Sequence, residues 1–265
     1  MTLPRRKSIP RKKSRVAGKD TEMSFWDHLE ALRGTLFRSV LAVVALSLIF
    51  LCFPKPLFQA VFWPTRADFP LYRLPGVDFS MDLINIELSA QFFFYLKVAV
   101  LCGVVLAFPI IVWEIWKFVA PALYEHEKKA VKKAFWLSSG LFYLGVAVGY
   151  FVVLPVCLMF FMNFSVSDAI VNTISLGSYM SLFTSMVFLI GLLFEFPTVI
   201  LVLSSLGIVD RVKLKHWRKY AFVIVLILAA FITPSDPFSM FVLAVPLYGL
   251  FELSILLCRK TVEAQ

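Results

Sequence analysis

Apolar residues in this chain are gathered into six runs that are separated by polar and charged connections. The runs cover roughly residues 36–53, 92–118, 135–160, 179–205, 220–232 and 239–257. Each run is continuous rather than alternating, which is typical of helices that cross a bilayer and not of a transmembrane β-barrel. We therefore predict an all-α integral membrane protein with six transmembrane helices.

The last two runs are short. The fifth extends only from Tyr220 to Ile232, and at about 1.5 Å per residue its helix reaches roughly 20 Å, less than the ~30 Å hydrocarbon core. Glu252 interrupts the sixth run. We expect a short fifth and a short sixth helix, which thin the bilayer locally or pack against longer helices.

Basic residues are distributed unequally between alternate connections. The chain has 26 Lys and Arg against 17 Asp and Glu, a formal net charge of +9. On one side of the predicted bundle lie only Lys55, Arg66 and Arg73, Lys97 lies within a run, and all the others belong to the opposite side. Because Lys and Arg accumulate in cytoplasmic connections, both termini are expected in the cytoplasm. This pattern indicates topology and not a nucleic-acid partner.

The composition of the two ends differs from that of the apolar part. Residues 1–22 are expected to be a disordered basic cytoplasmic tail held near anionic lipid headgroups. Residues 23–258 are expected to form the six-helix membrane domain and residues 259–265 a short cytoplasmic tail. The polar stretch before the first run is too long for a signal peptide, and no small-residue cleavage site follows that run.

Four ionisable residues lie inside the runs, and such residues are functional candidates in lipid. Lys97, Glu114 and Glu252 lie near span ends and can reach headgroup water, which favours a structural role. Glu195 lies more than a turn from either end, and Pro197 is expected to kink its helix. An unbroken helix places on the face of Glu195 the small or polar residues Ser181, Thr184, Gly191 and Thr198. This acid is either a protonated interhelical partner or the polar floor of a cavity.

Enzyme motifs are absent from the sequence. It contains no GxSxG, HExxH, P-loop or GxGxxG pattern. The four cysteines are interpreted as packing residues, and the three histidines match no metal template. We expect neither catalysis nor a cofactor or metal.

Several segments together resemble one family in their order and spacing. They are His28-Leu29-Glu30-Ala31-Leu32-Arg33, the stretch from Trp116 to Glu127, Phe194-Glu195-Phe196-Pro197, Arg218 to Tyr220, Thr233 to Asp236, and Pro246 to Glu252. Over about residues 23–258 the chain resembles TatC, the receptor subunit of the twin-arginine protein translocase.

The resemblance implies a curved, cup-like bundle of six helices in the bacterial cytoplasmic (inner) membrane. It implies that the chain recognises twin-arginine signal peptides of folded precursor proteins. With TatA/TatB-type single-span partners, in an oligomeric complex, it would translocate those precursors using the proton-motive force. TatC-like proteins are not enzymes.

The resemblance also assigns site residues. For signal-peptide binding they are Glu127, which matches the carboxylate that recognises the two arginines, together with Phe118, Pro121, Leu123, Tyr124, Glu30 and Arg33. For intramembrane polar or partner contacts they are Glu195, Pro197, Thr198, Asp236 and Glu252, and in the first periplasmic loop the match is Pro64. One departure stands out: Ala31 holds the place of the family's N-terminal Glu and Glu30 precedes it, about 100° away on a helix.

Two other functions remain open on the residues alone. A secondary transporter would use Glu195 as its proton or substrate site, and a membrane scaffold would transport nothing. A receptor should bind a signal peptide, whereas a transporter should bind or move a small solute.

The charge distribution makes a topology prediction. In a variant without the four native cysteines, single cysteines near residues 75, 165 or 236 should react with an impermeant thiol reagent added outside the cell. Cysteines at residues 20, 128 or 214 should react only after permeabilisation. The reverse labelling pattern would refute both the orientation and the resemblance.

Overall fold

The computed structural model describes residues 25–73, 79, 81–119, 128–167, 172–205, 207–233 and 236–258. The two expected tails, 1–22 and 259–265, lie outside the described residues. The α-helices are α1 (Phe25–Leu51), α2 (Pro54–Phe62), α3 (Ala90–Val119), α4 (Lys128–Val148), α5 (Leu154–Asn163), α6 (Leu176–Thr184), α7 (Ile190–Leu193), α8 (Phe196–Ser205), α9 (Arg211–His216), α10 (Arg218–Ile232) and α11 (Pro237–Leu257). Two π-helical segments, η5 (Gly149–Val153) and η6 (Ser185–Leu189), join α4 to α5 and α6 to α7.

Helical stretches coincide with the predicted apolar runs. Five of those within the described residues are long and apolar enough to cross a membrane: His28–Leu51, Ala90–Phe118, Phe135–Asn163, Leu176–Ser205 and Pro237–Leu257. The fifth run forms α10, whose 15 residues rise only about 22 Å. The last span, with 21 residues, is the shortest of the five. It continues through Glu252 to Leu257 and is not interrupted there.

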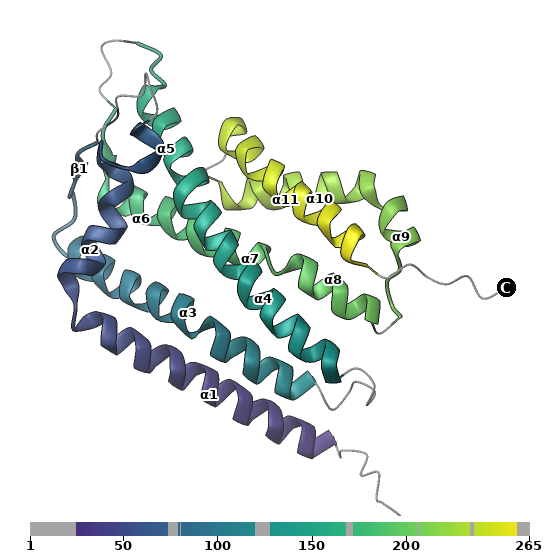
Figure 1. Ribbon diagram of the computed structural model, residues 1–265. Helices are drawn as coiled ribbons and strands as arrows, with labels where there is room; N and C mark the ends of the chain where they lie inside the picture. The colour runs from purple at the N-terminus through teal and green to yellow at the C-terminus, as the bar shows by residue number, and fades with distance from the viewer. Residues whose placement is uncertain are drawn as a thin grey trace, which may run out of the picture.

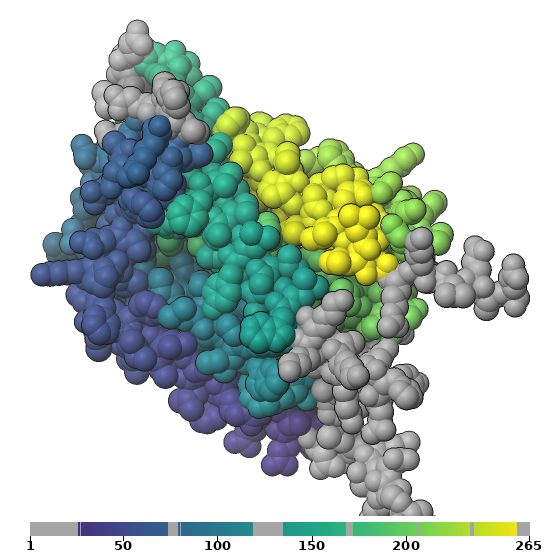
Figure 2. Space-filling model, viewed as in Figure 1, coloured from purple at the N-terminus to yellow at the C-terminus, as the bar shows by residue number. Residues whose placement is uncertain are grey.

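The helices alternate in direction. The right-hand side of Figure 1 holds the beginnings of α1 and α4, the ends of α3, α8 and α11, and helix α9. α2, β1 and the end of α5 lie on the other side. Helix α11 packs against η5 and α8, and it covers part of the bundle surface beside α4 (Figure 2). The pair α10 and α11 therefore closes one flank of the fold.

Helix α1 packs almost entirely on α3. Its buried polar residues Thr35, Ser39 and Ser47 repeat at helical spacing along this contact. A Cβ atom at Gly103 of α3 would lie 2.1 Å from the Ser47 hydroxyl, so the two backbones need a glycine there. Small residues permit such close approach in membranes, where packing replaces the hydrophobic effect as the driving force.

The two π-helical segments cross each other at the centre of the bundle. A Cβ atom at Gly149 would lie 2.1 Å from the carbonyl oxygen of Met186. Met186 is fully buried, as is Ile190 one turn further on. The wider turns of η5 and η6 thus meet where no side chain separates the two backbones.

The first long loop folds into a cap on the non-basic end of the bundle. It contains α2 and the short 3₁₀ helices η1 (Trp63–Thr65) and η2 (Pro70–Arg73). Three tyrosine hydroxyls, two from the bundle and one from the loop itself, donate hydrogen bonds to its carbonyls: Tyr150 to Ala60 at 2.5 Å, Tyr179 to Val61 at 2.5 Å and Tyr72 to Pro64 at 2.9 Å. The side chains of Phe69, Tyr72 and Phe79 are buried in the same region.

A small sheet adds to the helical fold that the sequence predicts. Strand β1 (Leu83–Ile84) pairs in parallel with β2 (Ile174–Ser175), in the register Leu83 to Ile174 and Ile84 to Ser175. The pairing joins the two long loops at this end of the bundle. It depends on contacts between segments far apart in sequence, and two-residue strands leave no alternating pattern to detect.

The crossing of η5 and η6 makes a stability prediction. Gly149→Ala should destabilise the protein by about 1–3 kcal/mol, because the added methyl group meets a backbone oxygen that cannot rotate away. Gly140→Ala in α4 is the matched control, since nothing lies within 4 Å of a Cβ atom there. The control should be neutral or slightly stabilising. Equal unfolding midpoints for both variants in detergent would contradict the close contact.

Candidate functional site

The expected signal-binding region begins where α1 and α3 meet on the basic side. Phe118, near the end of α3, is half-buried, and its ring lies 4.3 Å from the ring of His28 on α1, centroid to centroid. Glu30 and Arg33 are exposed on the first turns of α1. The helix is continuous from Phe25 to Leu51, so the backbone does not rotate Glu30 into the position that Ala31 occupies.

Four residues assigned by the resemblance lie outside the described residues. They are Pro121, Leu123, Tyr124 and Glu127. Their neighbours in the sequence are described: Phe118 lies in the last turn of α3, and α4 begins at Lys128. The connection that contains Glu127 is thus bounded by two helices that the bundle fixes in place.

A charged cluster links α1 to α3 close to this connection. The carboxylate of Glu114 accepts a hydrogen bond from Nε of Arg38 at 2.6 Å and from Nζ of Lys117 at 3.0 Å. The Glu114 side chain is only 7% exposed, whereas those of both cations are 55% exposed. A buried carboxylate needs such partners, since an unpaired charge in a nonpolar environment is costly. The cluster therefore ties the middle of α1 to the last turns of α3, and Glu114 has the structural role that its position predicts.

The sequence alone did not identify Arg38 and Lys117 as members of a cluster. The available signal was the placement of opposite charges near the same end of two consecutive antiparallel spans. The charges could be assigned to pairs only once the structure showed which faces of α1 and α3 are in contact.

Glu195 lies at a break in the fourth membrane-spanning stretch. α7 ends at Leu193 and α8 begins at Phe196, with Phe194 and Glu195 in a turn between them. The break precedes Pro197, which lacks the N–H that a continuous helix would use, as the sequence predicts. The hydroxyl of Ser138 on α4 donates a hydrogen bond of 2.6 Å to the Glu195 carboxylate. Thr198 is buried in the first turn of α8.

The prediction that Glu195 belongs to a single polar stripe along one helix face is wrong. Ser181 and Thr184 border a cavity that Lys97 of α3 also borders. Beyond η6 the helix turns a different face to α4: a Cβ atom at Gly191 would lie 2.7 Å from Val146, and Glu195 contacts Ser138. The π-helical turn changes the angle per residue, so positions before and after it do not follow one 100° repeat.

The two acids of the α10–α11 pair have local partners. Glu252 accepts hydrogen bonds from the guanidinium of Arg218 at 2.7 Å and from the hydroxyl of Tyr248 at 3.3 Å. Asp236 is the N-cap of α11, where its carboxylate accepts a hydrogen bond from the backbone N–H of Ser239 at 2.7 Å. The Glu252–Arg218 pair ties the beginning of α10 to the last turns of α11. The Asp236 carboxylate satisfies the Ser239 N–H, which has no partner within the first turn of the helix.

Pro64 lies within the cap. Its side chain is among the fully buried ones, and its carbonyl accepts the hydrogen bond from Tyr72 described above. Burial raises the pKa of the Tyr72 hydroxyl, which therefore remains a donor. Pro64 contributes to the packing of the loop and does not present its ring to solvent.

Comparisons of sequence and of structure both find TatC proteins. A family model described as Sec-independent protein translocase protein (TatC) matches residues 27–246. The chain is 38% identical to the TatC of Halothiobacillus neapolitanus over 91% of its own length and 63% of that protein, and 35% identical to the TatC of Blattabacterium over 88% and 94%. A crystal structure titled as the twin-arginine translocase receptor TatC superposes with a TM-score of 0.73 at 32% identity, covering 87% of this chain and 97% of that one.

The chain belongs to the TatC family. Its match spans somewhat less than two thirds of the Halothiobacillus TatC and nearly all of the Blattabacterium one.

Membership in the TatC family settles the class of the protein. TatC proteins are components of a Sec-independent protein translocase and not enzymes. Bacterial TatC proteins reside in the inner membrane, and the five candidate spans within the described residues agree with a multi-pass protein there. The helical fold expected from the apolar runs is confirmed by the structural match.

Proposed function

We propose that the chain is the receptor component of a twin-arginine translocase. In this role it recognises twin-arginine signal peptides of folded precursors at its basic, cytoplasmic side. With TatA/TatB-type partners it then translocates the precursors using the proton-motive force. The observation that carries this proposal is the TatC match over most of the chain at 32% identity or more to named family members.

The orientation and the domain limits are part of the same proposal. Both termini face the cytoplasm, α10 is the fifth of six spans, residues 1–22 and 259–265 are cytoplasmic tails, and residues 23–258 form the membrane domain. In support, the ends of α1, α3, α8 and α11 that adjoin the basic connections lie on one side of the bundle (Figure 1). A secondary transporter gains no support from the comparisons, because the relatives reported above are TatC proteins.

Glu127 is proposed to bind one guanidinium of the signal peptide directly. The cytoplasmic side is strongly basic, so long-range electrostatics disfavour a cationic ligand and a carboxylate must act at close range. A carboxylate and an Arg side chain can form two parallel hydrogen bonds, a geometry that Lys cannot reproduce. Four residues that precede this acid in the sequence, Phe118, Pro121, Leu123 and Tyr124, belong to the same proposed site, with Glu30 and Arg33 on helix α1 as further contacts.

The first functional prediction concerns Glu127. Glu127→Ala should reduce crosslinking to an Arg-Arg signal peptide roughly tenfold or more, close to the level of a Lys-Lys peptide, because a charge-assisted bond is lost. Glu127→Asp should lose less. Asp68→Ala, an exposed acid in the first long loop, should change nothing. If Glu127→Ala still discriminates Arg-Arg from Lys-Lys as the parent does, then Glu127 is not the contact, and Glu30 and Glu125 become the candidates.

A role in contact with partner helices is proposed for the region around Glu195. Phe196, its neighbour, packs on Phe251 of α11 with ring centroids 6.4 Å apart. Glu195 thus lies beside the flank formed by the short α10 and by α11, together with Pro197 and Thr198. Asp236 and Glu252 fix the two ends of that flank through the contacts described above.

The second functional prediction separates this role from plain packing. Glu195→Ala should leave membrane insertion and signal-peptide binding intact and should impair export of a folded precursor. Ser138→Ala, which removes only the hydrogen-bond donor, should retain most export activity. Equal export by Glu195→Ala and the parent would indicate a packing role. So would a loss in Ser138→Ala as large as in Glu195→Ala, because the hydrogen bond alone would then matter.

A further inference from the structure

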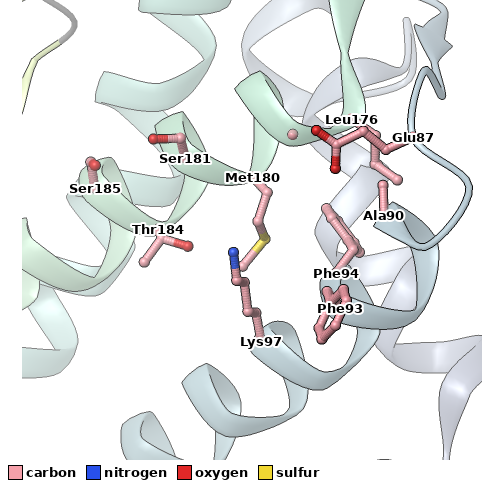
Figure 3. Close-up of a pocket in the computed structure, with 11 residues that line it drawn as sticks. Glu87, Ala90, Phe93, Phe94, Lys97, Leu176, Met180, Ser181, Thr184 and Ser185 are labelled. Atoms are coloured by element: carbon pink, nitrogen blue, oxygen red, sulfur yellow. The ribbon is translucent and has the colours of Figure 1, made fainter.

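A polar cavity lies between α3 and α6 at the end of the bundle that carries the cap. It has a volume of about 520 Å³ and is bordered by Lys97 and Glu87 on one side and by Ser181, Thr184 and Ser185 on the other. Figure 3 shows Lys97 reaching from α3 toward α6, with Glu87 away from it near Leu176. Within the described residues no ion pair joins Lys97 to Glu87, so the two opposite charges leave space between them.

An apolar groove continues from this cavity along the same two helices. Its volume is about 380 Å³, and it shares Lys97, Met180 and Thr184 with the polar cavity. The residues that extend it on α3 are Leu96, Val100 and Val104, and Phe188 of η6 borders its other wall. The side chains of Leu96 and Val100 are exposed on the helix surface.

The depth of the two sites matches the layers of a bilayer. Lys97 follows the first residue of α3, Ala90, by two turns, a descent of about 10 Å. An ammonium group at that depth can extend to the level of the headgroups. The apolar groove then runs from Lys97 toward the bilayer centre, because Val100 and Val104 follow on the next turns of the same face.

We propose that this combined site binds one phospholipid with an ethanolamine headgroup, in the leaflet that faces the cap. The phosphate is bound by the Lys97 ammonium and by the hydroxyls of Ser181, Thr184 and Ser185. The Glu87 carboxylate binds the ammonium of the headgroup. One acyl chain lies in the groove beside Val100. A soluble anion would pair with Lys97 but would leave Glu87 without a partner and the apolar groove empty, whereas one lipid of this kind satisfies both charges and fills the groove.

Lipid retention by the purified full-length chain tests this proposal. Detergent-solubilised protein is titrated with phosphatidylethanolamine or phosphatidylglycerol, and bound lipid is counted by native mass spectrometry. The parent should bind one phosphatidylethanolamine, with phosphatidylglycerol weaker. Lys97→Gln should weaken that binding about tenfold or more, because a charge-assisted bond is lost. Lys97→Arg should retain it, and Lys55→Gln, an exposed lysine of α2, is the matched control.

A second variant tests the groove without altering any charge. Val100→Trp fills the groove from an exposed position, so it should fold as the parent does and displace the acyl chain. Unchanged lipid binding in both Lys97→Gln and Val100→Trp would overturn the proposal. Equal or tighter binding of phosphatidylglycerol would overturn the role of Glu87.

Two further measurements distinguish other occupants. Inorganic phosphate and phosphoethanolamine should not displace the lipid, because neither fills the groove; effective displacement would show a site for a soluble anion instead. A photo-crosslinking residue at position 100, activated in cell membranes, should label phospholipid. Labelling of a protein instead would show that a partner helix, and not a lipid, occupies the groove.

Discussion

Inside a bilayer each backbone N–H and C=O must find a partner within the protein, and this constraint accounts for most of the fold. The membrane-spanning stretches are helical over nearly all of their apolar lengths for this reason. Where the chain departs from an α-helix, at η5, η6 and the break before Pro197, the irregular backbone lies between neighbouring helices. The cap follows the same constraint, since hydroxyls of Tyr150, Tyr179 and Tyr72 bind carbonyls that α2 and η1 would otherwise leave without partners.

The same low-water environment decides where charges can lie. Glu114 is buried only because Arg38 and Lys117 approach both of its oxygens, and Glu252 is paired with Arg218 where α10 begins. Both clusters lie on the basic side and join two helices each. The Glu114 cluster joins α1 to the part of α3 that precedes the connection containing Glu127. At the opposite end, Lys97 and Glu87 border a cavity without forming such a pair, which is why that cavity suits an external ligand and the two clusters do not.

Some expectations depended on properties that are local in the sequence, and these agree with the structure. Helical stretches fall on the apolar runs because a run of this length has no other stable form in lipid. α10 is short because its apolar run ends at Ile232. The helix breaks at Pro197 because proline lacks an N–H. In contrast, the polar stripe through Ser181, Thr184 and Glu195 was wrong, because it assumed 100° per residue across a segment that contains a π-helical turn.

The sequence by itself determined the class of the protein, its apolar spans, its charge asymmetry and the family motifs. Tertiary structure alone decided which residues meet: Arg38 with Glu114, Glu195 with Ser138, the Gly149 backbone with Met186, and strand β1 with β2. The physical reason is that hydropathy and charge are properties of single positions. They decide whether a side chain lies in lipid or in water, whatever the other helices do. A contact between helices depends instead on the rotation and crossing of both partners, which packing across the whole bundle determines.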